Sequence, residues 1–136
     1  MSVTILQAEV TDFEMIRGTR QVLDVLAGKW NIGVLYLLAS GTKRYSELFY
    51  EVGEVPKKTL TQTLRGLERD GLVTRRVYPQ VPAKVEYSLT SLGWSITTLL
   101  MEMYEWSASH ADEVEAARAA FEGAGSKPVP SLRLAA

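Results

Sequence analysis

The sequence predicts a mainly α-helical fold with a small β-hairpin, which is an α+β class. Three observations predict it: apolar residues recur at helical spacing in the first half of the chain, alternate with period two over residues 72–89, and return to helical spacing after Thr90. The length of 136 residues suits one modest core. We therefore expect one domain over residues 12–122, between an N-terminal arm (1–11) and a disordered tail (123–136).

Two helices are expected before residue 40. Asp12 is a good N-cap residue and predicts a helix over residues 12–27, on which Phe13 and Ile16 fall at helical spacing. A second helix is predicted from about residue 30 to residue 39, with Gly41 just past its end. Both carry enough apolar residues to bury one side.

Two more helices are expected between residues 45 and 71. A short one opens at Tyr45 and ends before Gly53. Pro56 fits the first turn of the next, where its missing N–H costs nothing, and Gly71 ends it. The inward stripe of this fourth helix consists of leucines at i, i+4 and i+7, namely Leu60, Leu64 and Leu67.

The period of the apolar pattern then changes to two. Residues 72–78 and 83–89 predict two strands, joined by a loop at 79–82 that two prolines stiffen. Thr90 can cap a long final helix, whose apolar residues recur at three and four. The serines at 107 and 109 allow a break there, after which the helix would resume to about Phe121.

This order of elements is that of a winged helix-turn-helix. The major groove of B-DNA is about 12 Å wide and admits one α-helix. The fourth helix presents donors opposite its leucines, and the candidate DNA-binding residues are Lys57, Lys58, Thr59, Thr61, Gln62 and Arg65. Among them Thr61, Gln62 and Arg65 suit base contacts. Lys57, Lys58 and the earlier Arg44 suit phosphates.

Charge is distributed unevenly along the chain. The net charge is −1, yet residues 43–84 carry a balance of +4 and residues 85–136 a balance of −4. Such a basic middle is typical of a phosphate-binding surface, and equally of solvated helix faces. Arg76 and Lys84 flank the hairpin tip and are candidate DNA contacts. Arg75 is predicted to have a structural role, paired with Asp70 or Glu86.

Several classes of chemistry are excluded. The chain has no cysteine and one histidine, which removes thiol catalysis, thiol redox sensing and zinc sites built on several imidazoles or thiolates. No glycine-rich phosphate loop occurs, so neither an enzyme nor a cofactor is expected. No apolar stretch reaches about 18 residues, so no membrane partner is expected and the predicted location is cytoplasmic.

Several ordered motifs resemble those of one family. They are Gly28-Lys29-Trp30, RYSEL at 44–48, LTQTLRGLERDGLV at 60–73 and PQVPAKVEYSLTSLG at 79–93. Over roughly residues 20–106 the sequence resembles the HxlR-type bacterial transcription regulators, winged-helix relatives of the MarR-type regulators. The resemblance implies a homodimer that binds an operator, with the fourth helix in the major groove. It also implies N- and C-terminal dimerisation helices, which form the interface between the two copies. The sequence departs from the usual Gly-Ile-Ser at 54–56, where it has Glu-Val-Pro.

The last helix carries more apolar surface than one core needs, which favours burial against a second copy over an effector pocket. The predicted dimer interface consists of Phe13, Ile16, Leu99, Leu100, Met103 and Trp106. The function predicted is a homodimeric, sequence-specific DNA-binding regulator on a pseudo-palindromic operator, with which a small-molecule effector is compatible. The alternatives are a winged-helix protein-interaction module and a small-molecule-binding protein without DNA affinity.

Overall fold

The computed structural model describes residues 11–124, so the expected arm and tail lie almost entirely outside the described residues. The chain divides into two compact units, one up to Thr98 and one from Leu99. This division falls inside the last helix, where neither composition nor turn residues mark it. The domain over residues 12–122 stays a prediction.

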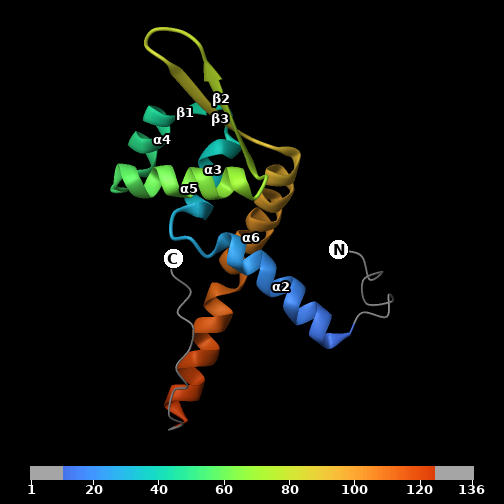
Figure 1. Cartoon of the computed structure of the whole chain (residues 1–136). Helices are drawn as coiled ribbons and strands as arrows, with labels where there is room; N and C mark the ends of the chain where they lie inside the picture. The colour runs from blue at the N-terminus through green and yellow to red at the C-terminus, as the bar shows by residue number, and fades with distance from the viewer. Residues whose placement is uncertain (1–10, 125–136) are drawn as a thin grey trace. The chain divides into compact units, whose positions relative to one another are not determined.

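The first unit contains four helices and a small sheet (Figure 1). The helices are α2 (Asp12–Leu26), α3 (Asn31–Ala39), α4 (Tyr45–Val52) and α5 (Lys57–Arg69). All four were predicted, with bounds that differ by a residue or two. The order confirms the mainly α fold with a winged helix-turn-helix arrangement.

Helix α2 begins with a capping box one residue earlier than predicted. Thr11, not Asp12, is the N-cap, and its Oγ1 accepts from the Glu14 backbone N–H at 3.2 Å. The Glu14 carboxylate in turn accepts from the Thr11 N–H at 3.0 Å. Leu26 is the one buried residue of α2, and Phe13 is 71% exposed. The N-terminus of α2 is therefore capped, but little of the helix surface packs against the rest of the described chain.

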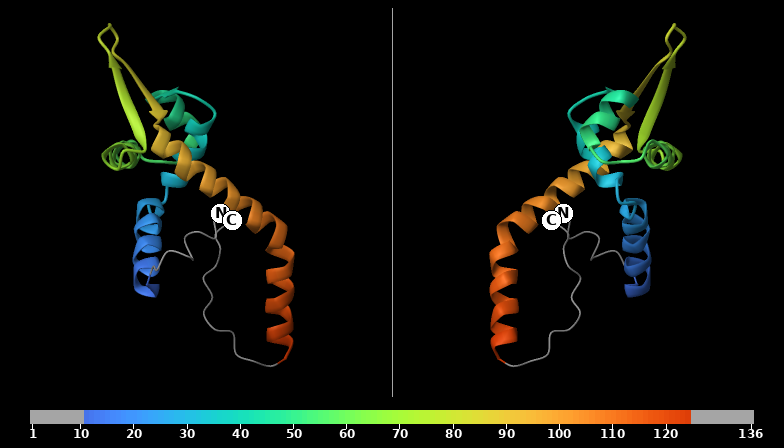
Figure 2. Two further views of the ribbon diagram at one scale, coloured as in Figure 1. Left: turned by 90° about the vertical axis from the view of Figure 1, so that its right-hand side faces the viewer. Right: turned by 90° about the vertical axis from the view of Figure 1, so that its left-hand side faces the viewer.

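The sheet has three antiparallel strands in the order β1-β3-β2. They are β1 (Lys43–Arg44), β2 (Val73–Tyr78) and β3 (Lys84–Leu89). The sequence predicted β2 and β3 but not β1, because two residues are too few to show a period. Hydrogen bonding opposite Tyr87 and Glu86 makes Lys43 and Arg44 a strand. The wing, which is β2, β3 and their tip, projects away from the helices (Figure 2).

The core of the first unit is built around α3. This helix packs against α4, α5 and β3. Its buried side chains meet those of the neighbouring helices, and all are at most 1% exposed: Val34, Leu35, Leu38, Leu48, Leu60, Leu64 and Leu67. Each such side chain contributes about 1.5–3 kcal/mol on burial. The predicted leucine stripe of α5 is confirmed.

A tight junction joins the end of α5 to the wing and to the start of α6 (Ser91–Gly123). Gly71 has φ +77°, a left-handed conformation that suits glycine. The Thr90 hydroxyl donates to the Gly71 carbonyl at 2.6 Å and accepts from the Gly93 N–H at 2.9 Å, which confirms Thr90 as the cap. A Cβ on Gly93 would lie 2.0 Å from the Leu72 carbonyl oxygen. Only glycine fits there.

Helix α6 runs without interruption, so the possible break at residues 107–109 is wrong. In the second unit Trp106 stacks on His110 with ring centroids 4.7 Å apart, and His110 Nδ1 lies 2.8 Å from the Trp106 carbonyl oxygen. These contacts span the place of the expected break and stabilise the helix across Ser107 and Ser109.

The helices of residues 11–124 lack membrane-spanning character when taken one at a time. No single one is long and apolar enough to cross a bilayer. Helices α2 and α3 meet the length and composition test only as a pair, and the chain bends by 78° between them.

Candidate nucleic-acid interface

The outer side of α5 is the centre of the candidate site. Pro56 is the N-cap with extended backbone (φ −62°, ψ 141°), and the helix begins at Lys57. While its leucines are buried, five of the six predicted donors are exposed: Lys57, Lys58, Thr61, Gln62 and Arg65. Thr59 is half-buried. The structure therefore brings five predicted residues onto one accessible helix side.

Helix α4 fixes the first turns of α5. The Tyr45 hydroxyl donates to the Lys57 carbonyl oxygen at 3.1 Å and lies 3.2 Å from the Thr61 hydroxyl. Phe49 stacks on Tyr45 with ring centroids 6.5 Å apart, and the Lys57 ammonium lies 5.6 Å from the Phe49 ring centroid. Sequence reasoning missed Tyr45 and Phe49 in this positioning function. Their aromatic i, i+4 spacing on the short helix was the available signal.

The tip end of the wing holds a network around Tyr78, which lies opposite Lys84 in the register. The ammonium of Lys84 and the guanidinium of Arg76 lie 4.9 and 4.8 Å from its ring centroid. Lys84 also forms an ion pair with Glu86 at 2.8 Å, and the Tyr78 hydroxyl donates to the same carboxylate at 3.3 Å. The hydrogen bond from Lys84 holds the pKa of Glu86 below its ordinary 4.5. Lys84 is therefore partly neutralised, whereas Arg76, although opposite Glu86 in the register, forms no ion pair within residues 11–124.

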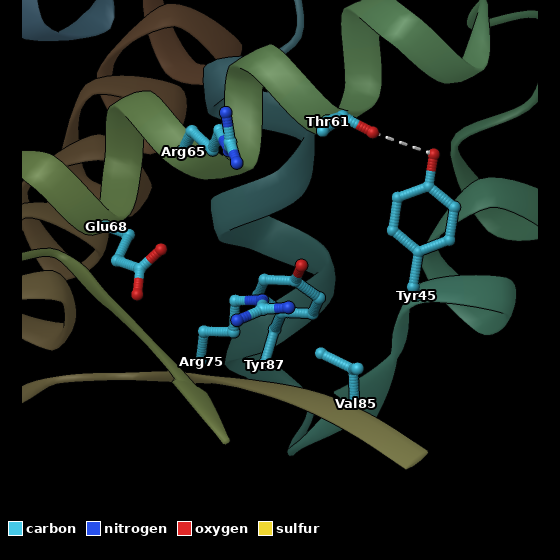
Figure 3. A pocket seen from close by; sticks show the side chains of 7 residues that line it. All are labelled: Tyr45, Thr61, Arg65, Glu68, Arg75, Val85 and Tyr87. Atoms are coloured by element: carbon cyan, nitrogen blue, oxygen red, sulfur yellow. Dashed lines mark hydrogen bonds between the residues drawn. The ribbon is translucent and has the colours of Figure 1, made fainter. Parts of the chain in front are cut away.

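The predicted structural pairing of Arg75 is wrong. Asp70 pairs with Arg69 at 3.2 Å, and Glu86 pairs with Lys84. Within residues 11–124 Arg75 has no ion pair or hydrogen bond from its side chain, and it lines a pocket between α5 and the wing (Figure 3). Sequence reasoning could not find this, because the pairing of acids depends on how α5 and β3 are placed.

The remaining predicted residue on this unit is Arg44. It sits at the end of β1 and immediately before α4, where its backbone N–H donates to the Glu47 carboxylate at 3.0 Å. Its side chain is exposed. The neighbouring Lys43 forms an ion pair with Glu51 at 2.9 Å. Arg44 thus has no ion pair within residues 11–124, although its charge acts on Glu86, which lies opposite it in the β1–β3 register.

Metal chemistry finds no support in the described part of the chain. No group of three or more His, Cys, Asp or Glu side chains there could hold an ion. The described residues instead form a helix, α5, that buries its leucines and exposes its donors. Helix α4 positions the first turns of α5, and a cationic hairpin lies beside it. This arrangement defines a winged helix-turn-helix DNA-binding protein.

Comparison with known proteins identifies the family. A family model described as HxlR-like helix-turn-helix matches residues 25–115, which is more than half of the chain. The chain belongs to this family of transcriptional regulators and is not an enzyme. The match confirms the resemblance drawn from the motifs.

Curated relatives and solved structures agree. The chain is 48% identical over 90 residues to YkvN of Bacillus subtilis, an HTH-type transcriptional regulator, covering 66% of this chain and 76% of YkvN. It is 39% identical over 100 residues to YtfH of Escherichia coli, covering 74% and 79%.

Among structures, a MarR-family regulator of Enterococcus faecalis has TM-score 0.71 at 31% identity, covering 80% of this chain and 97% of that one. The reduced redox regulator HypR has TM-score 0.67 at 40% identity, covering 73% and 98%.

Proposed function

We propose that the protein is a homodimeric, sequence-specific regulator that binds a pseudo-palindromic duplex in the cytoplasm. One observation carries the proposal: α5 buries Leu60, Leu64 and Leu67 to 0–1% exposure while its donors remain accessible on the opposite side. A helix fixed in this way presents a constant pattern of donors to a groove. The wing lies beside it, where it can follow the adjacent backbone.

The donors divide by their surroundings. The side chains of Arg65 and Gln62 form no hydrogen bond or ion pair with any residue from 11 to 124, and we propose that they contact base edges. Thr61 also faces the groove, but its hydroxyl already lies against that of Tyr45. Lys57, Lys58 and Arg44 are proposed to bind phosphates. Half-buried Thr59 contributes least, and Arg76 contributes more than the paired Lys84.

The proposed dimer uses apolar surface that each unit leaves exposed. On α2 this surface includes Phe13 and Ile16. A helix of 15 residues is marginal in water without packing, so a cover for α2 is needed. On α6 the exposed side chains form a stripe at helical spacing, namely Leu99, Met103, Trp106 and Phe121. Leu100 is 3% exposed and has too little free surface to belong to the interface as predicted.

Two-fold symmetry would set two copies of α5 about 34–36 Å apart, one helical turn of DNA. Phosphate neutralisation by several cations would make affinity fall steeply with salt. Selection of bound duplexes from random sequences tests the half-site spacing. Titration of the selected duplex, carrying a label, over several salt concentrations tests the salt dependence.

In that titration we expect Arg65→Ala and Gln62→Ala to weaken specific binding more than non-specific binding. Lys57→Ala should weaken both and reduce the salt slope by about one unit. Arg118→Ala, on α6, is the matched control. Affinity that does not respond to salt or to these changes contradicts the proposal.

Dimerisation is tested separately by sedimentation against protein concentration. Trp106→Ala should raise the dimer dissociation constant about 10–100-fold, because large aromatic side chains dominate interface energetics. Tyr104→Ala is the control, since two residues along a helix point to nearly opposite sides. A wild-type protein that stays monomeric at all concentrations overturns the dimer.

An effector and the two alternative functions make different predictions. A small molecule that acts on this regulator would raise the melting temperature and change duplex affinity together. A small-molecule-binding protein would gain melting temperature from its ligand without duplex affinity. A protein-interaction module would show no duplex affinity at any salt. Thiol chemistry is unavailable to such regulation, because the chain has no cysteine.

A further inference from the structure

A pocket of about 340 Å³ lies within the first unit, between α5 and the wing (Figure 3). Arg65 and Thr61 enter it from α5, Arg75 from β2 and Tyr45 from the start of α4. Its remaining lining residues are Glu68, Val85 and Tyr87. The pocket therefore touches both elements proposed to face DNA.

The free donors of this pocket are its two arginines. Tyr45 and Thr61 are occupied with one another at 3.2 Å, and the Tyr45 hydroxyl is also bonded to the Lys57 carbonyl. Neither Arg65 nor Arg75 has a hydrogen bond or ion pair from its side chain to any residue between 11 and 124. Glu68 is the one acid among the lining residues, so the pocket has an excess of one positive charge.

We infer that this pocket receives a phosphate of the DNA backbone, with Arg75 as its ligand from the wing. The inference rests on the proposed DNA-binding function and adds a contact residue to it. A guanidinium presents paired N–H donors that match phosphate oxygens, and Arg75 has no competing partner. The charge of Arg65 adds to the attraction from α5 while its own donors stay available for a base edge.

The position of Arg75 gives this contact a structural consequence. Arg75 lies opposite Tyr87 in the β2–β3 register, near the helices and away from the wing tip. A phosphate bound there would tie the base of the wing to α5. Glu68 opposes the phosphate, which limits affinity for any duplex regardless of its sequence.

Four variants test the assignment by duplex titration over several salt concentrations. Arg75→Ala should weaken operator and non-specific duplex equally, by about tenfold, and reduce the salt slope by about one unit. Arg75→Lys should retain the salt slope of the wild type but recover only part of the affinity, because lysine lacks the paired N–H donors of a guanidinium. Glu68→Gln should tighten both duplexes by about threefold. Arg118→Ala is the control.

The outcomes separate this inference from the proposed function. Wild-type protein that binds its operator, with Arg75→Ala and Glu68→Gln both unchanged, overturns the pocket and leaves the DNA-binding function standing. Wild-type protein with no duplex affinity overturns both. Equal melting temperatures of Arg75→Ala and wild type show that lost affinity is not lost folding.

Competition between inorganic phosphate and duplex is the last experiment. Added at constant ionic strength, it should displace duplex weakly and equally from wild type and Arg75→Ala. Displacement from wild type alone at low phosphate would assign the pocket to a free anion and overturn the inference.

Discussion

Helix α5 and the wing are both proposed to face DNA, yet they hold their cations differently. On α5, Lys58 and Arg65 have no ion pair with any residue from 11 to 124. On the wing, Lys84 is bound to Glu86 at 2.8 Å and lies over Tyr78. The two elements thus differ at Lys84, the paired cation of the hairpin, whereas Arg75 and Arg76 have no ion pair within residues 11–124.

The difference follows from what stabilises each element. Leucines on the inner side of α5 hold it to the core, so its outer side chains need no partners. The wing has little core of its own, because Val77 is 50% exposed and Val81 at the tip is fully exposed. Cross-strand side-chain contacts must stabilise the wing instead. Buried leucines leave the charged side chains of α5 available for a ligand. An element that is stabilised by contacts between surface side chains uses part of its charge in those contacts.

The largest expected effect separates the two sources of stability. Leu64→Ala removes an anchor of α5 and should cost about 2–5 kcal/mol of unfolding free energy. Val77→Ala on the half-exposed wing should cost less than about 1 kcal/mol. Chemical denaturation of both variants measures this, and equal losses would break the comparison.

A matched pair of lysines tests the free and the paired charge. Lys58→Ala should lower duplex affinity about tenfold, because an unpaired ammonium is lost from the phosphate contacts. Lys84→Ala should lower it less than about threefold, since Glu86 already offsets that charge. Titration at several salt concentrations compares them. A larger effect at Lys84 would mean that the pair opens on DNA.

Releasing the paired lysine sharpens the same point. Glu86→Gln keeps an acceptor for Tyr78 but removes the charge facing Lys84, so duplex affinity should rise about twofold with a steeper salt slope. Glu51→Gln, which frees Lys43 at β1, is a control for added net charge alone. Identical gains from both variants would show that the site of the charge does not matter.

The smallest effect is a pH dependence of stability. The hydrogen bond from Lys84 lowers the pKa of Glu86 in the folded state, so its stabilising contribution is complete above the ordinary value of 4.5. It is lost as pH falls through the lowered folded pKa. Melting temperatures of wild type and Glu86→Gln should therefore converge as the solution is acidified. A gap that stays constant down to about pH 2 contradicts the pairing.

Local patterns predicted much of the architecture. The leucines of α5, the two strands of the wing and the Thr90 cap are each specified by residues within one or two turns of one another. Five of the six α5 donors are exposed as their spacing opposite the leucines indicated. The family assignment likewise depended on motifs read along the chain.

The sequence by itself determined which segments form helices and strands, because periodicity is a property of neighbouring residues. Only the tertiary structure decided the partners of charges and the accessibility of surfaces: Arg75 is unpaired, Lys84 is paired, and Leu100 is buried. An ion pair or a pocket depends on distances between elements far apart in sequence. Helix packing and strand register fix those distances, and local sequence patterns do not report them.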